Sequence, residues 1–237
     1  MNLKKYIPNF LTLLNLFCGC VALVFVSKSS FEIAFFFVAL GIFFDFFDGF
    51  FARLFKVSQP LGVQLDSLAD MVTSGVVPGF TMFQVLSKYS LFGETSLVPY
   101  LGFVITLGAC YRLAKFNIDT RQSDSFIGLP TPANTLFFLS IPLITATFQD
   151  DIFHRFIANQ WVLVGLCFLS AYVMNAEIPL FSLKIKNFSF AKYKLQISFL
   201  IVSLFLLGFF QALGVALVIV LYVILSVLNN LFLSKKE

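Results

Sequence analysis

Eight apolar runs follow one another along this chain, and each is about long enough to form a membrane-spanning helix. A span needs about 20 apolar residues at a rise of 1.5 Å per residue. No stretch between the runs is polar enough to form a soluble domain. We therefore predict an all-α fold, a polytopic integral membrane helical bundle of about eight transmembrane helices in a single domain, 1–237. The predicted spans are 9–27, 32–55, 64–87, 97–118, 133–149, 158–175, 195–210 and 213–233.

The balance of apolar and charged residues supports this class. Of the 237 residues, 59% are hydrophobic and 12% are charged, whereas a soluble domain carries roughly 25% charged residues. So little polar surface cannot coat a soluble globule, and the surplus apolar surface is expected to face lipid. The net charge of +4 is modest, and in a membrane protein it reports orientation rather than nucleic-acid binding.

Lysine and arginine fall unequally on the two sides of the predicted bundle. Thirteen of the 16 lie on one side, and Lys28, Lys88 and Arg155 lie on the other. By the positive-inside rule the richer side is cytoplasmic, so both termini are predicted to be cytoplasmic. The thirteen are Lys4, Lys5, Arg53, Lys56, Arg112, Lys115, Arg121, Lys184, Lys186, Lys192, Lys194, Lys235 and Lys236.

The sequence gives only weak indications of a signal peptide and of a zinc site. Lys4 and Lys5 precede an apolar run, as in a signal peptide, but no A-x-A-like cleavage site follows, so a retained first helix is expected. The four cysteines form no C-x-x-C pair, and His154 is the single histidine. A zinc site is therefore not expected.

Four aspartates interrupt the apolar pattern around the second and third spans: Asp45, Asp48, Asp66 and Asp70. The short connection near Pro60 makes these spans antiparallel neighbours. The i,i+3 and i,i+4 spacings place each pair on one helix face. We therefore expect four carboxylates at similar depth in one small volume.

Clustered carboxylates repel one another and lose hydration, unless a cation supplies the missing positive charge. Arg53 and Lys56 are the nearby basic residues, too few to neutralise four acids, although pairing with basic residues or a proton relay is the alternative reading. An all-oxygen ligand set favours Mg²⁺, Mn²⁺ or Ca²⁺. Four carboxylates suffice for two bridged ions with positions left for phosphate oxygens.

Small residues and one arginine beside the acids fit phosphate chemistry. Gly49 and Ala52 let a ligand approach the second span closely, and Gly62 opens the start of the third. Arg53, about one turn from Asp48, offers a bidentate contact to phosphate.

The whole run, D45-x2-D48-G49-x2-A52-R53-x8-G62-x3-D66-x3-D70, resembles the motif of the CDP-alcohol phosphatidyltransferases at every fixed position. These are integral membrane enzymes that join a CDP-linked group to an alcohol. The resemblance implies that Asp45, Asp48 and Asp66 bind metal, Mg²⁺ or Mn²⁺ as two ions, and that Asp70 binds metal and acts as the general base. It further implies that the CDP-lipid site is lined by Gly49, Ala52, Arg53 and Gly62, and that the protein is a homodimer.

Three further stretches resemble the phosphatidylserine synthase branch of that family: Ile7–Gly19, Tyr111–Asn117 and Gly128–Asn134. With the aspartate motif the resemblance covers roughly the first 140 residues, and the extra C-terminal spans, about 158–233, carry no readable motif. It implies transfer of a phosphatidyl group from CDP-diacylglycerol to L-serine, which releases CMP. The active site would face the cytoplasm from the inner membrane.

Residues that would hold the acceptor are less clear from the sequence. Arg112 and Lys115 lie at the cytoplasmic end of the fourth span, level with the aspartates, where they could bind the serine carboxylate, bind a lipid phosphate or anchor the helix. Asn9, Thr12 and Asn15 share one face of the first span and could bind a head group, bind cytidine or join helices.

Two other functions stay open at this point. The same chemistry with glycerol 3-phosphate would give phosphatidylglycerophosphate. A cation transporter could also use the acids, but transporters place such charges near the bilayer midplane, whereas these four lie toward one interface.

Overall fold

The computed structural model describes residues 6–57, 60–93, 95–119, 127–148, 152–181 and 194–233. Within these ranges the secondary structure is helical, apart from turns and one isolated bridge between Ile127 and Pro179. The prediction of an all-α membrane protein is confirmed. Eight of the thirteen basic residues counted on the cytoplasmic side lie outside the described residues: Lys4, Lys5, Arg121, Lys184, Lys186, Lys192, Lys235 and Lys236.

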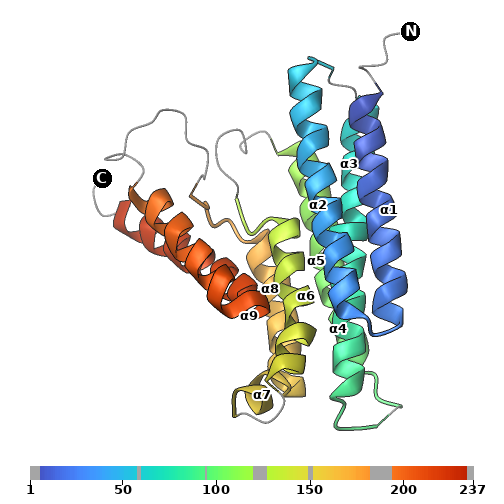
Figure 1. Ribbon diagram of the computed structural model, residues 1–237, viewed down its shortest axis with the longest axis vertical. Coiled ribbons are helices and arrows are strands. Elements are labelled where there is room, and N and C mark those ends of the chain that lie inside the picture. Colours follow the sequence, from blue (N-terminus) through green and yellow to red (C-terminus); the bar gives the residue numbers. More distant parts are fainter. Residues whose placement is uncertain are drawn as a thin grey trace.

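The helices follow the predicted spans closely (Figure 1). Their bounds are α1 Ile7–Ser27, α2 Phe31–Leu54, α3 Pro60–Asp70, η2 Met71–Val76, α4 Val77–Lys88, η3 Val98–Phe103, α5 Val104–Ile118, α6 Thr131–Thr147, α7 Ile152–Ile157, α8 Gln160–Asn175 and α9 Lys194–Leu233. The short α7 was not predicted. The third predicted span corresponds to α3, the π-helix η2 and α4 in direct succession.

Four helical segments of the described chain are each long and apolar enough to cross a membrane by length and composition: Ile7–Ser27, Phe31–Leu54, Val98–Ile118 and Lys194–Leu231. The chain is therefore a multi-pass membrane protein. The full count of eight spans stays a prediction, because α6 and α8 are shorter than a typical span and the third is divided by η2.

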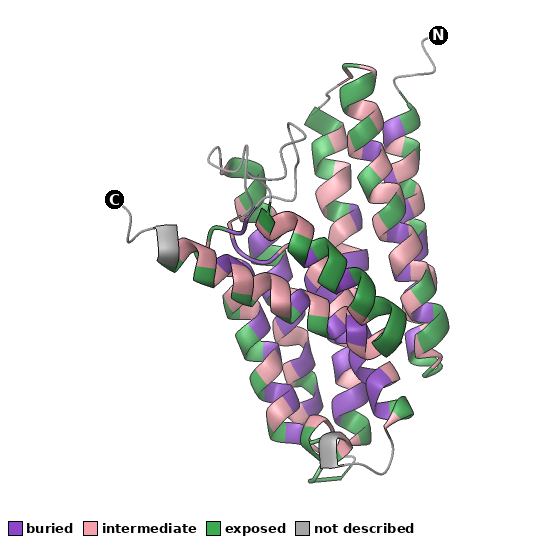
Figure 2. Cartoon of the chain, turned by 60° about the vertical axis from the view of Figure 1, so that its left-hand side comes forward, coloured by how far each residue is buried: buried purple, intermediate pink, exposed green. Residues whose placement is uncertain are grey.

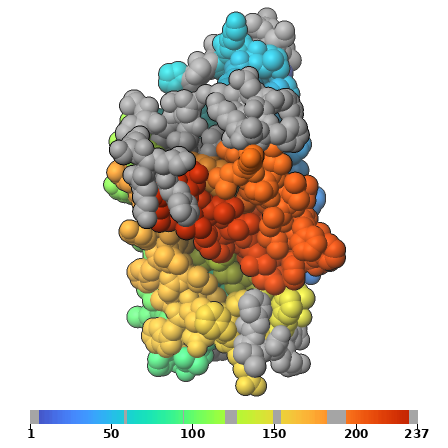
Figure 3. All heavy atoms as spheres, turned by 90° about the vertical axis from the view of Figure 1, so that its left-hand side faces the viewer, coloured from blue at the N-terminus to red at the C-terminus, as the bar shows by residue number. Residues whose placement is uncertain are grey.

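The long α9 is two helices joined at a sharp reversal. Gln211 has φ 47° and ψ −116°, which is not helical. Its two halves lie side by side in Figure 1, and Figure 3 shows them across one face of the bundle. The halves approach closely at Gly214, where a Cβ would lie 2.2 Å from the Leu206 carbonyl oxygen. The seventh and eighth predicted spans therefore form this hairpin.

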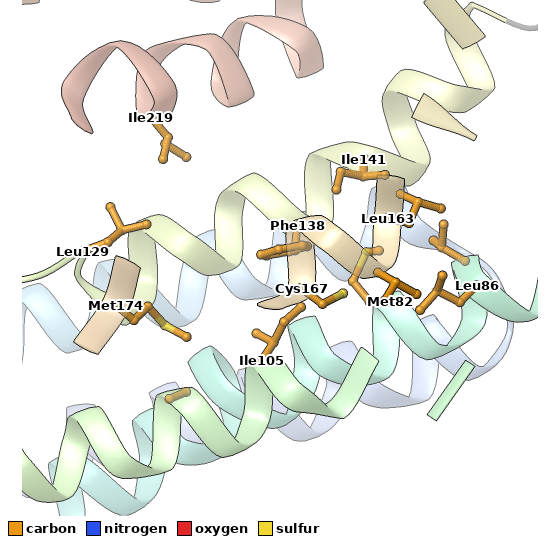
Figure 4. Close-up of a cluster of buried hydrophobic side chains, with 13 residues drawn as sticks. Met82, Leu86, Ile105, Leu129, Phe138, Ile141, Leu163, Cys167, Met174 and Ile219 are labelled. Carbon is orange, nitrogen blue, oxygen red and sulfur yellow. The ribbon is translucent and has the colours of Figure 1, made fainter. Parts of the chain in front are cut away.

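A buried apolar cluster joins α4, α5, α6 and α8 (Figure 4). Met82, Leu86, Ile105, Phe138 and Leu163 lie at its centre and are essentially inaccessible to solvent. Buried residues gather where helices face one another, while the outer faces of the helices are largely exposed (Figure 2). This core gives the bundle a rigid base below the end of the molecule that carries the aspartates.

The helix ends that carry basic residues agree with the predicted asymmetry. The C-terminal ends of α2 and α5 lie at the same end of the bundle as the start of α1 (Figure 1). Arg53, Lys56, Arg112 and Lys115 belong to these ends, whereas Lys28 and Lys88 follow or finish helices at the opposite end. The direction in which this bundle crosses the membrane stays a prediction.

Candidate functional site

The aspartates come from two helices that both pack against α1, and their acidic side chains converge near one end of the bundle. Asp45 and Asp48 lie on α2, and Asp66 and Asp70 lie on α3. Asp45, Asp48 and Asp66 can each present one oxygen so that the three oxygens lie within 4.8 Å of one another. Asp48 is 6% exposed. The predicted meeting of the two acidic faces is present.

The first helix supplies two polar partners to this cluster. The Thr12 hydroxyl donates to Asp48 Oδ2 at 2.6 Å, and the Asn15 side-chain amide donates to Asp70 Oδ1 at 3.1 Å. Both residues are buried. For these two side chains the structure therefore shows bonding between helices, one of the roles weighed from the sequence.

A cavity of about 130 Å³ opens beside Asp48 and Asp66, and small residues form much of its wall. Gly49, Ala52 and Gly62 all line it, as the motif led us to expect. A Cβ at Gly62 would lie 3.2 Å from Asn9 Oδ1, which is tighter than an ordinary contact. Arg53 lies over Gly49, with Nη1 3.4 Å from the place a Cβ would take.

A second cavity, of about 210 Å³, lies against the other acids. Asp45, Asp66 and Asp70 line it together with Arg112, and the remaining lining residues come from α3, from α5 and from the entry to α6: Ser67, Leu113, Phe116, Pro130, Thr131 and Pro132. Asp66 lines both cavities. The carboxylate cluster thus separates two hollows that each reach it.

Arg112 and Lys115, the two basic residues predicted to bind the acceptor substrate, have different surroundings. Arg112 is 7% exposed, and its Nη1 donates to Ile127 O at 2.9 Å and to Met174 O at 2.6 Å. Lys115 forms an ion pair with Glu177 at 3.7 Å. Lys115 lines a separate small hollow beside Met174 and Asn175, which Arg112 also borders.

Arg112 fixes the loop that leads into α6. Gly128 in this loop has φ +74°, and a Cβ there would lie 2.3 Å from Met174 O, so the close approach to α8 requires glycine. Thr131 begins α6, with a proline in the first turn. The residues Pro130, Thr131 and Pro132 that follow this loop form one wall of the second cavity.

Ser67, Phe116 and Thr131 also line the second cavity, although they were not predicted as site residues. Ser67 stands between two motif aspartates, and its hydroxyl accepts a 2.9 Å hydrogen bond from Asn117 Nδ2 on α5. Phe116 and Asn117 belong to the Tyr111–Asn117 stretch, and Thr131 belongs to Gly128–Asn134. Both stretches had been noted for their resemblance to the family, but the order of residues along the chain does not show that they meet α3 at one cavity.

The donor set fits a divalent cation. Three carboxylates converge, and no salt bridge joins the four aspartates to a lysine or arginine among the described residues. Hard oxygen donors that converge in this way suit Mg²⁺, Mn²⁺ or Ca²⁺. The cluster could therefore hold a metal ion, as predicted.

The family model that matches residues 5–172 of the chain, which include this carboxylate cluster, is CDP-alcohol phosphatidyltransferase. The chain belongs to this family, which is a family of phosphotransferases. The family predicted from the aspartate motif is confirmed.

Individual relatives are similar over most of the chain. A CDP-diacylglycerol–serine O-phosphatidyltransferase of Helicobacter pylori (strain 26695) is 31% identical over 232 residues, 97% of this chain and 92% of the relative. The protein of the same name from Bacillus subtilis is 37% identical over 178 residues, 73% of this chain and 89% of the relative. Another, from Methanocaldococcus jannaschii, is 28% identical over 186 residues, 78% of this chain and 79% of the relative.

Proposed function

We propose that this protein transfers the phosphatidyl group of CDP-diacylglycerol to the hydroxyl of L-serine and releases CMP. The observation that carries the proposal is the pair of cavities that meet at Asp66, because a transfer reaction needs two substrates on either side of one reacting group. The serine-specific names of the similar proteins support the choice of acceptor.

The cavity beside Asp48 suits the CDP-lipid. Gly49, Ala52 and Gly62 let a pyrophosphate approach the helix backbones, since bulkier side chains there would occupy the hollow. Arg53 lies over Gly49, from where its guanidinium can reach a phosphate oxygen in a bidentate contact.

The cavity beside Asp70 suits the acceptor. Asp70 lines it, and one of its oxygens is already held by Asn15, which leaves the other free to take the proton of the serine hydroxyl. As that proton leaves, the hydroxyl oxygen bonds to the lipid-side phosphorus and the bond from this phosphorus to the CMP oxygen breaks. General-base assistance of this kind is worth about 10²- to 10⁴-fold in rate.

Arg112 is the residue we assign to the serine carboxylate. It lines the same cavity as Asp70, and its burial argues against a role in anchoring the helix among lipid head groups. Its Nη1 is used by two carbonyl oxygens, so the contact to serine would come from its other N–H groups. Lys115 is paired with Glu177 and stays the weaker alternative.

Asp45, Asp48 and Asp66 would hold two ions, Mg²⁺ or Mn²⁺, with Asp70 as a further ligand. When bound, the ions neutralise charge on the phosphoryl oxygens and on the departing CMP. The Thr12 hydroxyl keeps Asp48 oriented toward the site, and Arg53 adds positive charge beside the donor phosphates.

The charge asymmetry of the sequence supports a proposed orientation in the membrane. We infer an inner-membrane protein whose active site faces the cytoplasm, where serine is available, while CDP-diacylglycerol enters from the bilayer. A homodimer is part of the same proposal. No observation favours glycerol 3-phosphate as acceptor or a transport function.

An acceptor panel tests the proposal. Purified protein is given CDP-diacylglycerol, Mn²⁺ or Mg²⁺ and one acceptor at a time, L-serine, glycerol 3-phosphate or inositol, and CMP release is measured. We expect release with serine well above the rate without acceptor. Turnover with glycerol 3-phosphate and none with serine would refute the assignment of the acceptor while leaving the family intact.

A further inference from the structure

The helix that carries Asp66 and Asp70 changes its hydrogen-bonding pattern directly after Asp70. Residues Met71–Val76 form the π-helix η2, in which the Val77 N–H donates to Val72 O, five residues back. Pro78 follows in the first turn of α4. Proline has no N–H, and its ring clashes with the carbonyl four residues earlier, here that of Ser74. The sequence therefore imposes the irregular turn at this point.

The carbonyl groups disturbed by this turn are bonded by threonines from two neighbouring helices. The Thr106 hydroxyl on α5 donates to Gly75 O at 2.9 Å. The Thr135 hydroxyl on α6 lies within hydrogen-bond distance of two carbonyl oxygens, 3.0 Å from Ser74 O and 2.8 Å from Thr131 O. Thr135 is fully buried. In a membrane protein such hydroxyls replace lost backbone bonds.

The same turn is tied to the partner of Asp70. The Thr73 hydroxyl, inside η2, donates to the Asn15 backbone carbonyl at 3.1 Å, and the Asn15 side chain donates to Asp70. Contact at this point is close, because a Cβ at Gly19 would lie 2.4 Å from Thr73 Oγ1. A shift of η2 would therefore move both Asp70 and the amide that orients it.

We propose that the Met71–Val76 π-helix, held by Thr106 and Thr135, sets the position of Asp70 against the acceptor. The two threonines are then positioning residues, since they act through the turn and do not line either cavity. The inference rests on the role of Asp70 in the proposed function. It adds that α5 and α6, which bear no motif acid, control the catalytic carboxylate.

The test uses the full-length protein and removes one hydroxyl at a time. Thr135→Val keeps the side-chain shape and loses the bond to Ser74 O, and Thr135→Ser restores the hydroxyl. The matched control is Thr145→Val on the same helix, because the buried Thr145 hydroxyl bonds only within α6 among the described residues, to Pro142 O at 3.0 Å. Thr106→Val forms a second test, with Thr81→Val as its control, since Thr81 bonds to Val77 O within α4.

Three quantities are compared: kcat with the best acceptor of the panel, KM for CDP-diacylglycerol, and Mn²⁺ binding followed by electron paramagnetic resonance. Misplacement of a catalytic group by about 1 Å can cost on the order of 10²-fold in rate. We expect Thr135→Val and Thr106→Val to lower kcat roughly 10- to 100-fold, with KM for the CDP-lipid and Mn²⁺ affinity near wild type. Thr135→Ser should recover most of the rate.

Amide hydrogen exchange gives a readout that needs no turnover. Thr135→Val should speed exchange over residues 71–77, and Thr145→Val should not. The inference is overturned if Thr135→Val matches Thr145→Val in both kcat and exchange. It is also overturned if Thr135→Val and Thr106→Val fold but both keep wild-type kcat. Failure of the wild-type protein to use serine would instead count against the proposed function. The role of η2 would still be decided, by the comparison of hydrogen exchange and by the rate with another acceptor.

Discussion

The side-chain amide of Asn15 donates a 3.1 Å hydrogen bond to Asp70 Oδ1 across the interface between α1 and α3. It fixes one carboxylate oxygen of the proposed base and leaves the other for the acceptor. The Asn15 backbone is itself held by Thr73. The first helix is thus part of the proposed catalytic arrangement, although it carries none of the motif acids.

Asn15→Leu tests this relationship. A hydrogen bond to a charged group contributes about 1.5–3 kcal/mol, so its loss should lower kcat roughly 10- to 100-fold with little change in KM for the CDP-lipid. Steady-state CMP release measures both constants. Gln160→Leu is the control, because the buried Gln160 side chain at the start of α8 accepts from the Leu91 N–H and lines neither cavity. Equal losses of kcat in the two variants would contradict the role of Asn15.

Divalent metal should be required for activity, since three carboxylates converge and form no salt bridge among the described side chains. Excess chelator should abolish CMP release, and added Mn²⁺ or Mg²⁺ should restore it. Mn²⁺ binding to the wild-type protein, measured by electron paramagnetic resonance, provides an independent readout. Full activity in excess chelator would refute the metal requirement.

The four aspartates should differ in what their substitution costs. Asp45, Asp48 and Asp66 form the closely spaced group, and Asp70 lies outside it on the acceptor side. Asp45→Asn and Asp66→Asn should weaken Mn²⁺ binding, whereas Asp70→Asn should keep most CDP-lipid binding and lower kcat by about 10²- to 10⁴-fold, the range of general-base assistance. Variants that are indistinguishable in Mn²⁺ affinity and rate would remove this division of roles.

The KM for serine should distinguish Arg112 from Lys115. Loss of a charge-assisted bond from Arg112 to the serine carboxylate should raise this KM roughly 10- to 100-fold in Arg112→Gln. Lys115→Gln breaks the ion pair with Glu177 and should leave the KM near wild type. Folded protein is confirmed by thermal unfolding, because Arg112 also bonds to Ile127 O and Met174 O. The reverse order of effects would transfer the role to Lys115.

Much of the fold was predictable because apolar runs of span length have few alternatives to helices in a membrane. The acidic faces of α2 and α3 were predictable for a similar reason: fixed helical spacing and one short connection place Asp45, Asp48 and Asp66 together. The positions of Gly49, Ala52 and Gly62 around the first cavity were predictable from their spacing to the aspartates on the same two helices.

Other features depend on contacts between segments that the linear pattern does not pair. Arg112 contacts Ile127 and Met174, and no spacing rule brings α8 to the entry of α6. The break between the spans 195–210 and 213–233 was predicted, but Gln211 is not a glycine, so the sequence did not indicate the positive φ of the reversal. The π-helix after Asp70 could have been suspected from Pro78, but its threonine partners lie on other helices.

A competition assay tests the central claim most directly. Purified protein receives CDP-diacylglycerol, Mn²⁺ and equal concentrations of isotope-labelled L-serine and glycerol 3-phosphate, and the lipid products are identified by mass spectrometry. The account predicts labelled phosphatidylserine as the dominant product, formed together with CMP and lost in Asp70→Asn. Phosphatidylglycerophosphate as the dominant product, or labelled phosphatidylserine formed equally well by Asp70→Asn, would contradict it.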